Sequence, residues 1–192
     1  ARIPRLPLTP ARVKEALQRS LGLHVDAGRL LVGVVTRLAY QKGVDLLVLA
    51  MRTLAAEGVQ LALLGSGDPP LERQLAQLAA DMPESVSISF GYDDAASHRI
   101  IAGADVVAVP SRYEPCGLTQ LYGLRYGSLP VVHAVGGLAD TVVDANEANL
   151  NADRATGFSF VNATETALHA TLHRAQRLFA DRTRWQQVMR RA

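Results

Sequence analysis

Short apolar runs alternate with amphipathic stretches along most of the chain, and this alternation predicts its elements. Six apolar runs are predicted strands: Leu30–Thr36, Val59–Leu64, Val86–Phe90, Val106–Val109, Leu129–His133 and a last short one, Gly157–Val161. Several of them are apolar throughout, which is typical of strands buried on both faces of a parallel sheet.

The stretches between these runs have helical periodicity. Helices are predicted over Ala11–Ser20, Val44–Glu57, Pro70–Ala80, Asp94–Gly103, Gly117–Tyr126, a short segment after Gly137, Thr164–Phe179 and Arg182–Arg191. Thr9 is the expected N-cap of the first helix, with Pro10 at its first position. We expect an irregular lead-in over residues 1–10 and a long loop over Asn146–Gly157.

Strands that alternate with helices indicate a doubly wound, Rossmann-like α/β fold around a parallel sheet. The chain has 192 residues, which is long enough for a sizeable core. No internal boundary is visible, so residues 1–192 are expected to form one domain. The absence of an initial Met suggests a fragment or a processed chain, and the first residues lack the layout of a signal peptide.

Composition narrows the possible partners. Hydrophobic residues make up 48% of the chain, which indicates a globular protein, and the formal net charge of +2 is too small to indicate a nucleic-acid partner. No apolar stretch reaches the roughly 20 residues that a membrane span needs, so no membrane partner is expected. The single cysteine excludes an internal disulfide and favours a reducing, cytoplasmic location.

Much of the positive charge lies near the end of the chain. These residues are Arg174, Arg177, Arg182, Arg184, Arg190 and Arg191. We interpret them as a solvated helix face, and contact with an anionic partner or a missing segment is the alternative.

Two cations follow the first predicted strand, at the edge where open α/β sheets bind ligands. Arg37 comes directly after that strand, and Lys42 follows five residues later. Such a pair can hold a diphosphate, with Arg as a bidentate fork and Lys as a mobile charge. Taken alone the spacing favours two solvated residues, but a second anion site at the same edge strengthens the functional interpretation.

That second site follows the strand Val106–Val109. The N–H groups of Gly117, Leu118 and Thr119 open a predicted helix, where phosphate is favoured. Glu114 is a candidate for contact with a sugar hydroxyl or for stabilising positive charge. Cys116 lies beside the helix start, so its thiol is a weak candidate nucleophile; a packing or sugar-contacting role is favoured.

Other segments near this edge are less specific. Tyr92, after the third strand, either stacks on a base or a sugar or covers the edge of the core. Gly65-Ser66-Gly67 resembles the start of a dinucleotide fingerprint, but Pro70 occupies the place of the third glycine, so NAD and FAD are rejected and no cofactor is expected. For Gly136-Gly137 a tight turn is favoured over a close approach to ligand. No D-x-D or C-x-x-C spacing occurs, and no metal site is expected.

Four segments together resemble bacterial glycogen synthase and plant starch synthase: Thr36–Gly43, Leu64–Asp68, Pro110–Gly127 and Gly136–Val142. The similarity runs in order from about Leu30 to Arg190, and the block Glu114–Gly127 is its most specific part. His133 departs from the family, which commonly has arginine there.

The resemblance implies the GT-B fold, in which two Rossmann-like halves face each other across a cleft. This chain is similar to the C-terminal, nucleotide-sugar-binding half, and the N-terminal, acceptor-binding half is absent. The family transfers glucose from ADP-glucose to the non-reducing end of an α-1,4-glucan, with retention of configuration and no required metal.

The same resemblance implies roles for the candidate residues. Arg37 and Lys42 would hold the diphosphate, and Tyr92 would lie near the adenine. Glu114 would be the acidic residue at the glucose. The amides of Gly117, Leu118 and Thr119 would bind the distal phosphate.

The isolated chain is expected to bind ADP weakly and not to transfer glucose. One alternative is a related GT-B enzyme with another donor, such as a UDP-sugar. Another is a non-catalytic nucleotide-binding or interaction domain. The presence of Glu114, Arg37 and Lys42 argues against this last alternative for the parent protein.

Overall fold

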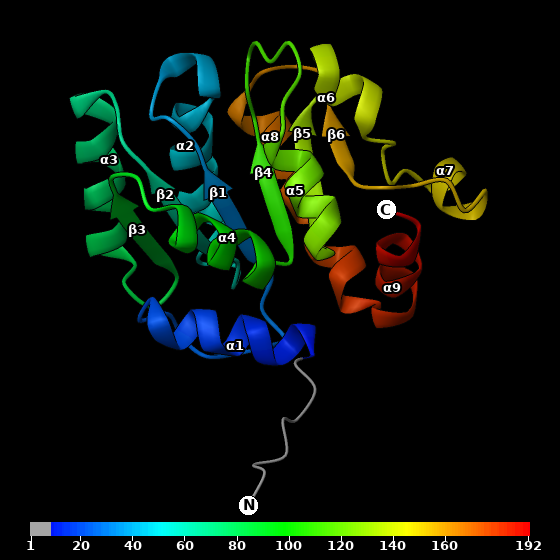
Figure 1. Cartoon of the computed structure of the whole chain (residues 1–192), viewed down its shortest axis with the longest axis horizontal. Helices are drawn as coiled ribbons and strands as arrows, with labels where there is room; N and C mark the ends of the chain where they lie inside the picture. The colour runs from blue at the N-terminus through cyan, green and yellow to red at the C-terminus, as the bar shows by residue number, and fades with distance from the viewer. Residues whose placement is uncertain (1–8) are drawn as a thin grey trace, which may run out of the picture.

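One parallel sheet contains all the strands of the computed structural model, which describes residues 9–192. The strands are β1 (Leu31–Val35), β2 (Gln60–Gly65), β3 (Val86–Phe90), β4 (Val106–Val109), β5 (Leu129–His133) and β6 (Phe158–Phe160). Their order across the sheet is β3-β2-β1-β4-β5-β6 (Figure 1). The chain therefore builds outward from β1 to β3 and then returns to β4, which leaves a topological switch point between β1 and β4.

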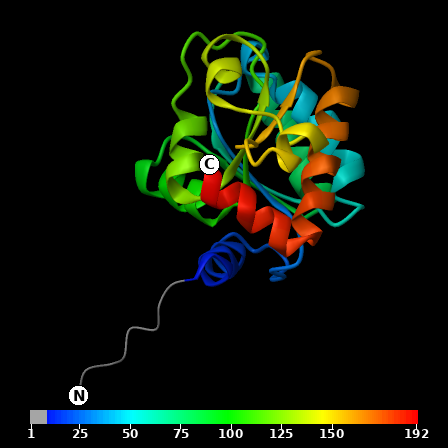
Figure 2. The ribbon, with the colours of Figure 1, turned by 90° about the vertical axis from the view of Figure 1, so that its right-hand side faces the viewer.

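The helices are α1 (Pro10–Ser20), the 3-10 turn η1 (Tyr40–Lys42), α2 (Val44–Leu54), α3 (Pro69–Asp81), α4 (Asp94–Gly103), α5 (Thr119–Tyr126), α6 (Gly136–Thr141), α7 (Glu147–Asn151), α8 (Glu165–Ala180) and α9 (Arg182–Arg191). Figure 2 shows the sheet between two helix layers, with α2, α3 and α8 on one side and α4 and α5 on the other. Successive β1 side chains enter opposite layers: Val32 joins the α2–α3–α8 core, and Leu31 joins the core with α1 and α4. The predicted doubly wound α/β fold is confirmed.

Several local predictions need correction. The expected helix Val44–Glu57 ends at Leu54, and the chain then turns through Gly58 with a left-handed φ of 89°. The expected helix Gly117–Tyr126 begins at Thr119, because Gly117 has a left-handed φ of 69° that a right-handed helix does not accept. The expected loop Asn146–Gly157 contains α7, whose first turn is capped by the Asn146 side chain. The 3-10 turn η1 directly before α2 was not predicted. The expected lead-in falls mostly on residues 1–8, which lie outside the described residues.

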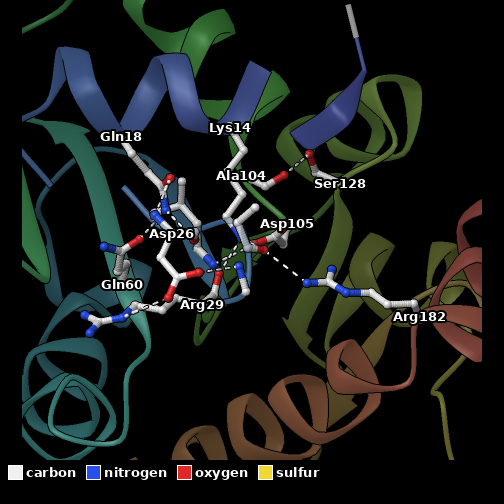
Figure 3. Close-up of polar contacts among 12 residues, drawn as sticks. Lys14, Gln18, Asp26, Arg29, Gln60, Ala104, Asp105, Ser128 and Arg182 are labelled. Atoms are coloured by element: carbon white, nitrogen blue, oxygen red, sulfur yellow. Dashed lines mark hydrogen bonds and ion pairs between the residues drawn. The ribbon is translucent and has the colours of Figure 1, made fainter. Parts of the chain in front are cut away.

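Helix α1 crosses the amino ends of the strands and is held there by a buried ion pair (Figure 3). The Lys14 ammonium donates to Asp105 Oδ2 at 2.5 Å, to the Ala27 carbonyl at 3.2 Å and to the Arg29 carbonyl. Asp105 Oδ2 also accepts the Leu31 N–H at 2.8 Å. Burial lowers the pKa of Lys14 and raises the pKa of Asp105.

A second buried contact ties the next turn of α1 to the sheet. Gln18 Nε2 donates to Gln60 Oε1 at 2.6 Å and to the Asp26 carbonyl at 2.9 Å. Gln18 Oε1 accepts the Asp26 N–H, so every polar group of this side chain has a partner. Within residues 9–192, no helix combines the length and apolar character needed to cross a membrane.

Candidate functional site

The carboxyl ends of β1 and β4 bring Lys42 and Glu114 together. Lys42 Nζ lies 2.6 Å from Glu114 Oε2, and the Ser111 hydroxyl donates to the same oxygen at 3.2 Å. The side chains of Lys42 and Glu114 are 19% and 15% exposed, so the pair is partly open to solvent. This is the switch point of the sheet, where doubly wound folds bind ligands.

Gly43 allows the loop that carries Lys42 to approach the end of β4. Its φ is 68°, and a Cβ at this position would lie 2.1 Å from the Pro110 carbonyl oxygen. Any side chain would therefore strain the backbone and separate the two strand ends. Glycine at this position lets the loop that carries Lys42 lie close to the end of β4.

Arg112 joins the same two loops through contacts that were not predicted from sequence. Its guanidinium forms two hydrogen bonds of 2.7 Å to the Asp45 carboxylate and one of 2.7 Å to the Tyr40 carbonyl. It also lies 3.7 Å from the centroid of the Tyr40 ring. The hydrogen bonds to Asp45 raise the pKa of Arg112. A usable sequence signal was the arginine at a strand end together with an aspartate in the first turn of the helix that follows β1.

The turn before α5 leaves backbone donors without protein partners. Leu118 is the N-cap of α5 and makes no side-chain capping hydrogen bond. The N–H groups of Gly117 and Leu118 donate to no protein acceptor within residues 9–192. Thr119, the first residue of α5, lines a hollow of about 30 Å³ together with Lys42 and Glu114. Free amides at a helix start suit an anion.

The paired glycines at the start of α6 pack against the Glu114–Cys116 segment. A Cβ on Gly136 would lie 2.2 Å from the Glu114 carbonyl oxygen, and one on Gly137 would lie 2.2 Å from the Cys116 carbonyl oxygen. The Gly137 N–H donates to the Pro115 carbonyl at 3.2 Å. A tight turn therefore explains these glycines only in part, because both also make room for the loop that carries Glu114.

His133 supports this loop from the inside. One ring nitrogen lies 2.8 Å from the Ser111 carbonyl oxygen, and the other lies 2.9 Å from the Val161 carbonyl oxygen. The side chain is buried and stacks on Phe160. Both ring nitrogens therefore face protein carbonyls.

Arg37, Tyr92 and Cys116 lie near the same edge but outside the Lys42–Glu114 contact. Arg37 is exposed and forms no ion pair with any residue in the range 9–192. Tyr92 is 88% exposed and lines a separate hollow of about 560 Å³. Cys116 is exposed. The structure thus brings together Lys42, Glu114 and Thr119 and leaves the other three side chains free.

The Gly65–Gly67 turn packs against the extension of β1. A Cβ on Gly65 would lie 2.0 Å from the Thr36 carbonyl oxygen, and one on Gly67 would lie 2.2 Å from the Leu38 carbonyl oxygen. These contacts lie on either side of Arg37 in sequence. The glycines therefore serve close chain packing beneath the Arg37 segment, near the expected site.

The basic residues near the end of the chain are partly paired within it. Arg174 contacts Asp144 at 2.9 Å, and Arg184 contacts Glu147 at 3.0 Å. Arg182 lies 3.8 Å from the centroid of the Phe179 ring. The prediction of a solvated helix face therefore describes these basic residues only in part, since several of them contact other side chains of the chain.

His169 and His173 lie one helical turn apart on α8 and form an H-x-x-x-H spacing, which was overlooked when a metal site was rejected from the sequence. Their rings are parallel, with centroids 6.4 Å apart. Among residues 9–192, no group of three His, Cys, Asp or Glu side chains is placed to hold a metal ion.

The family model for glycosyl transferases group 1 matches residues 22–190, and the chain belongs to this family. It is 53% identical over 176 residues to a glycogen synthase of Methylocella silvestris, covering 92% of this chain and 36% of that protein. It is 52% identical over 182 residues to a glycogen synthase of Edwardsiella ictaluri, covering 95% and 38%. The chain thus spans little more than a third of these relatives, and the resemblance found in the sequence is confirmed.

Solved structures support the same assignment. The catalytic domain of starch synthase IV from Arabidopsis thaliana, bound to ADP and acarbose, matches with a TM-score of 0.85 and 35% identity, over 94% of this chain and 38% of that one. Sucrose-phosphate synthase from Thermosynechococcus elongatus matches with a TM-score of 0.67 and 26% identity, over 95% of this chain and 45% of that one. The fold is that of a GT-B glycosyltransferase domain.

Proposed function

We propose that this chain is the donor-binding domain of a retaining glucosyltransferase. The enzyme would transfer glucose from ADP-glucose to the non-reducing end of an α-1,4-glucan. The single observation that carries the proposal is the Lys42–Glu114 contact beside the free amides of Gly117 and Leu118. These groups combine a cation, a carboxylate and anion-binding donors at one switch point.

The site suits the charges that develop during glycosyl transfer. When the bond between the sugar C1 and the phosphate oxygen breaks, its electron pair stays on ADP and positive charge develops on the sugar. Lys42, Arg37 and the amides of residues 117–119 would stabilise the ADP charge. Glu114 would stabilise the sugar or orient one of its hydroxyls.

We propose transfer on one face of the sugar, assisted by the leaving phosphate and without a covalent intermediate on the protein. The acceptor 4-hydroxyl oxygen forms the new bond to C1 as the phosphate leaves. Its proton passes to the departing phosphate oxygen, and the products are the elongated glucan and ADP. Tyr92 would lie near the adenine, and Cys116 would contact the sugar.

The comparisons support the substrate assignment through two kinds of relative, glycogen synthases and a starch synthase. The glycogen synthases are about half identical to this chain, and the starch synthase IV structure holds ADP and acarbose. The hollow beside Lys42 measures only about 30 Å³, about the volume of one water molecule. A hollow of this size cannot enclose a nucleotide sugar, so we propose that a second domain covers the donor. We also propose that residues 1–192 form one domain. A cytoplasmic location is also part of the proposal.

Calorimetric titration of the 192-residue chain with ADP, UDP and GDP tests the donor assignment. We expect weak binding with ADP preferred, and a preference for UDP would favour another GT-B donor.

In the full-length enzyme, Glu114→Gln should lower the turnover rate by about 100-fold, as when one charge-stabilising group is removed, with ADP affinity nearly unchanged. Equal losses of turnover and ADP affinity would contradict the role of Glu114. Glucan elongation by the purified chain alone would contradict the need for a second domain.

A further inference from the structure

Gln120 lies behind the turn whose amides the proposed function assigns to phosphate. It is on the first turn of α5 and is fully buried. Its Nε2 lies 3.0 Å from the Gly117 carbonyl oxygen, 3.3 Å from the Cys116 carbonyl oxygen and 3.3 Å from Thr141 Oγ1. The Thr141 hydroxyl itself donates to the Gly137 carbonyl, so all three neighbours accept from Gln120. These acceptors determine which end of the side-chain amide faces the turn.

Because the peptide bond is planar, these contacts also determine the direction of the N–H groups in the turn. In a trans peptide unit the C=O and the N–H point in opposite directions. The Cys116 carbonyl shares a peptide unit with the Gly117 N–H, and the Gly117 carbonyl shares one with the Leu118 N–H. Because Gln120 holds both carbonyls on the buried side, both N–H groups face away from the core. They are the same two N–H groups that have no protein acceptor among the described residues.

The remaining polar atom of Gln120 indicates that this arrangement is not explained by stability alone. Gln120 Oε1 is buried and has no hydrogen-bond partner within residues 9–192. Such an atom disfavours folding. A Cβ on Gly117 would lie 2.6 Å from Oε1 and 2.9 Å from Nε2. Gly117 and Gln120 therefore fit against each other, and the glycine leaves room for the side-chain amide.

We propose that Gln120 is a positioning residue for the distal phosphate of the donor. It does not touch the ligand; it holds two carbonyls inward so that the amides of Gly117 and Leu118 face the phosphate. This inference rests on the proposed function and adds a residue that determines the geometry of its anion site.

The test compares ADP with AMP, which lacks the distal phosphate. Gln120→Met keeps the length of the side chain and removes its N–H groups. In calorimetric titrations of the 192-residue chain, this variant should bind ADP about tenfold more weakly. Its affinity for AMP should change by less than about twofold. Equal weakening of ADP and AMP, or unchanged ADP binding, would overturn the inference.

Gln18→Met is the matched control. Gln18 is also a fully buried glutamine whose Nε2 donates to a backbone carbonyl, but it lies at the opposite end of the sheet. Its loss should lower the melting temperature while leaving the ratio of ADP to AMP affinity unchanged. A change in this ratio equal to that of Gln120→Met would show a general effect of stability and would also overturn the inference.

A measurement on the unsubstituted chain does not depend on the folding of a variant. The NMR signals of the Gln120 side-chain amide should shift on addition of ADP and not on addition of AMP; no shift with ADP overturns the inference. If the unsubstituted chain does not prefer ADP to AMP, the proposed function fails and the inference fails with it. If that preference is present and Gln120→Met retains it, only the inference fails.

Discussion

The two lysines of the chain, Lys14 and Lys42, lie at opposite ends of the sheet, and each contacts a carboxylate. Lys14 lies at the amino end with 3% of its side chain exposed and donates to three protein oxygens. Lys42 lies at the carboxyl end with 19% exposed and donates to Glu114. The ion pairs are chemically alike, but their surroundings differ.

The difference shows how the two ends of one sheet can serve stability and binding separately. At the amino end Lys14, Asp105 and Gln18 are satisfied by partners in the chain, so the network holds α1 in place. At the carboxyl end the N–H groups of Gly117 and Leu118 lack such partners within residues 9–192. A polar group with a complete set of internal partners is structural, and one that keeps free donors at a strand end is a candidate for ligand binding.

The largest expected effect is a difference in the free energy of unfolding when the carboxylate of each ion pair is replaced by an amide. Asp105→Asn leaves the buried Lys14 ammonium without a counter-charge and should lower the free energy of unfolding by about 3–5 kcal/mol. Glu114→Gln, the matched change at the more open pair, should cost less than about 1 kcal/mol. Urea denaturation measures both. Equal losses would contradict the distinction between a structural end and a binding end.

A somewhat smaller effect is expected at the loop that carries Lys42. Gly43→Ala should lower the free energy of unfolding by about 2–3 kcal/mol, through left-handed strain and collision with the Pro110 carbonyl. Gly58→Ala is the control, because Gly58 has a φ of 89° and open space around its Cβ position. It should cost only about 1–2 kcal/mol. The comparison fails if the two variants are equally destabilised in thermal melts.

The third expected effect is a difference in ADP affinity when each lysine is replaced by methionine. Lys42→Met should weaken ADP binding about 10–100-fold, which corresponds to about 1.4–2.8 kcal/mol. Its free energy of unfolding should change by less than about 1 kcal/mol. Lys14→Met should show the reverse: a clear loss of stability with unchanged ADP affinity in the folded fraction. Calorimetry measures the ADP affinity of both variants, and urea denaturation measures their free energy of unfolding. Weaker ADP binding by Lys14→Met, or a clear loss of stability in Lys42→Met, would contradict the prediction.

The smallest expected effect is the dependence of stability on alkaline pH. Burial lowers the pKa of Lys14 below its ordinary 10.5, so the unfolded chain binds more protons between the lowered value and 10.5. The free energy of unfolding should therefore rise with pH in that window, by at most about 1.4 kcal/mol per pH unit. Lys14→Met should lose this rise and Lys42→Met should keep it, as measured by urea denaturation across the window. Identical slopes in all three proteins would be the contrary result.

The fold was predictable because its signals are local. Strand β4 and helices α4 and α9 have the predicted bounds, since apolar runs, an Asp93 cap and helical periodicity define them within a few residues. The start of α5 was not predicted, because the left-handed backbone of Gly117 depends on how Gln120 and α6 pack beside it. Helix α7 was hidden in a turn-rich stretch whose capping residue, Asn146, is common in loops.

The candidate site was predictable in its location but not in its internal contacts. The strand-end rule placed Lys42, Glu114 and the 117–119 amides at one edge. Arg112, His133 and Gln120 were not given supporting roles, because their partners lie far away in sequence or are backbone carbonyls. Such contacts leave no periodic pattern in a single sequence.

We propose that Lys42 and the amides of residues 117–119 form one binding site for the diphosphate of a nucleotide. The most direct measurement is an ADP titration of the isotope-labelled 192-residue chain, followed through its backbone amide signals. The largest shifts should fall on Gly117, Leu118, Thr119 and the Arg37–Lys42 loop, with little change around Lys14. Shifts confined to the arginine-rich α8 and α9, or distributed over the surface with none at residues 117–119, would contradict it.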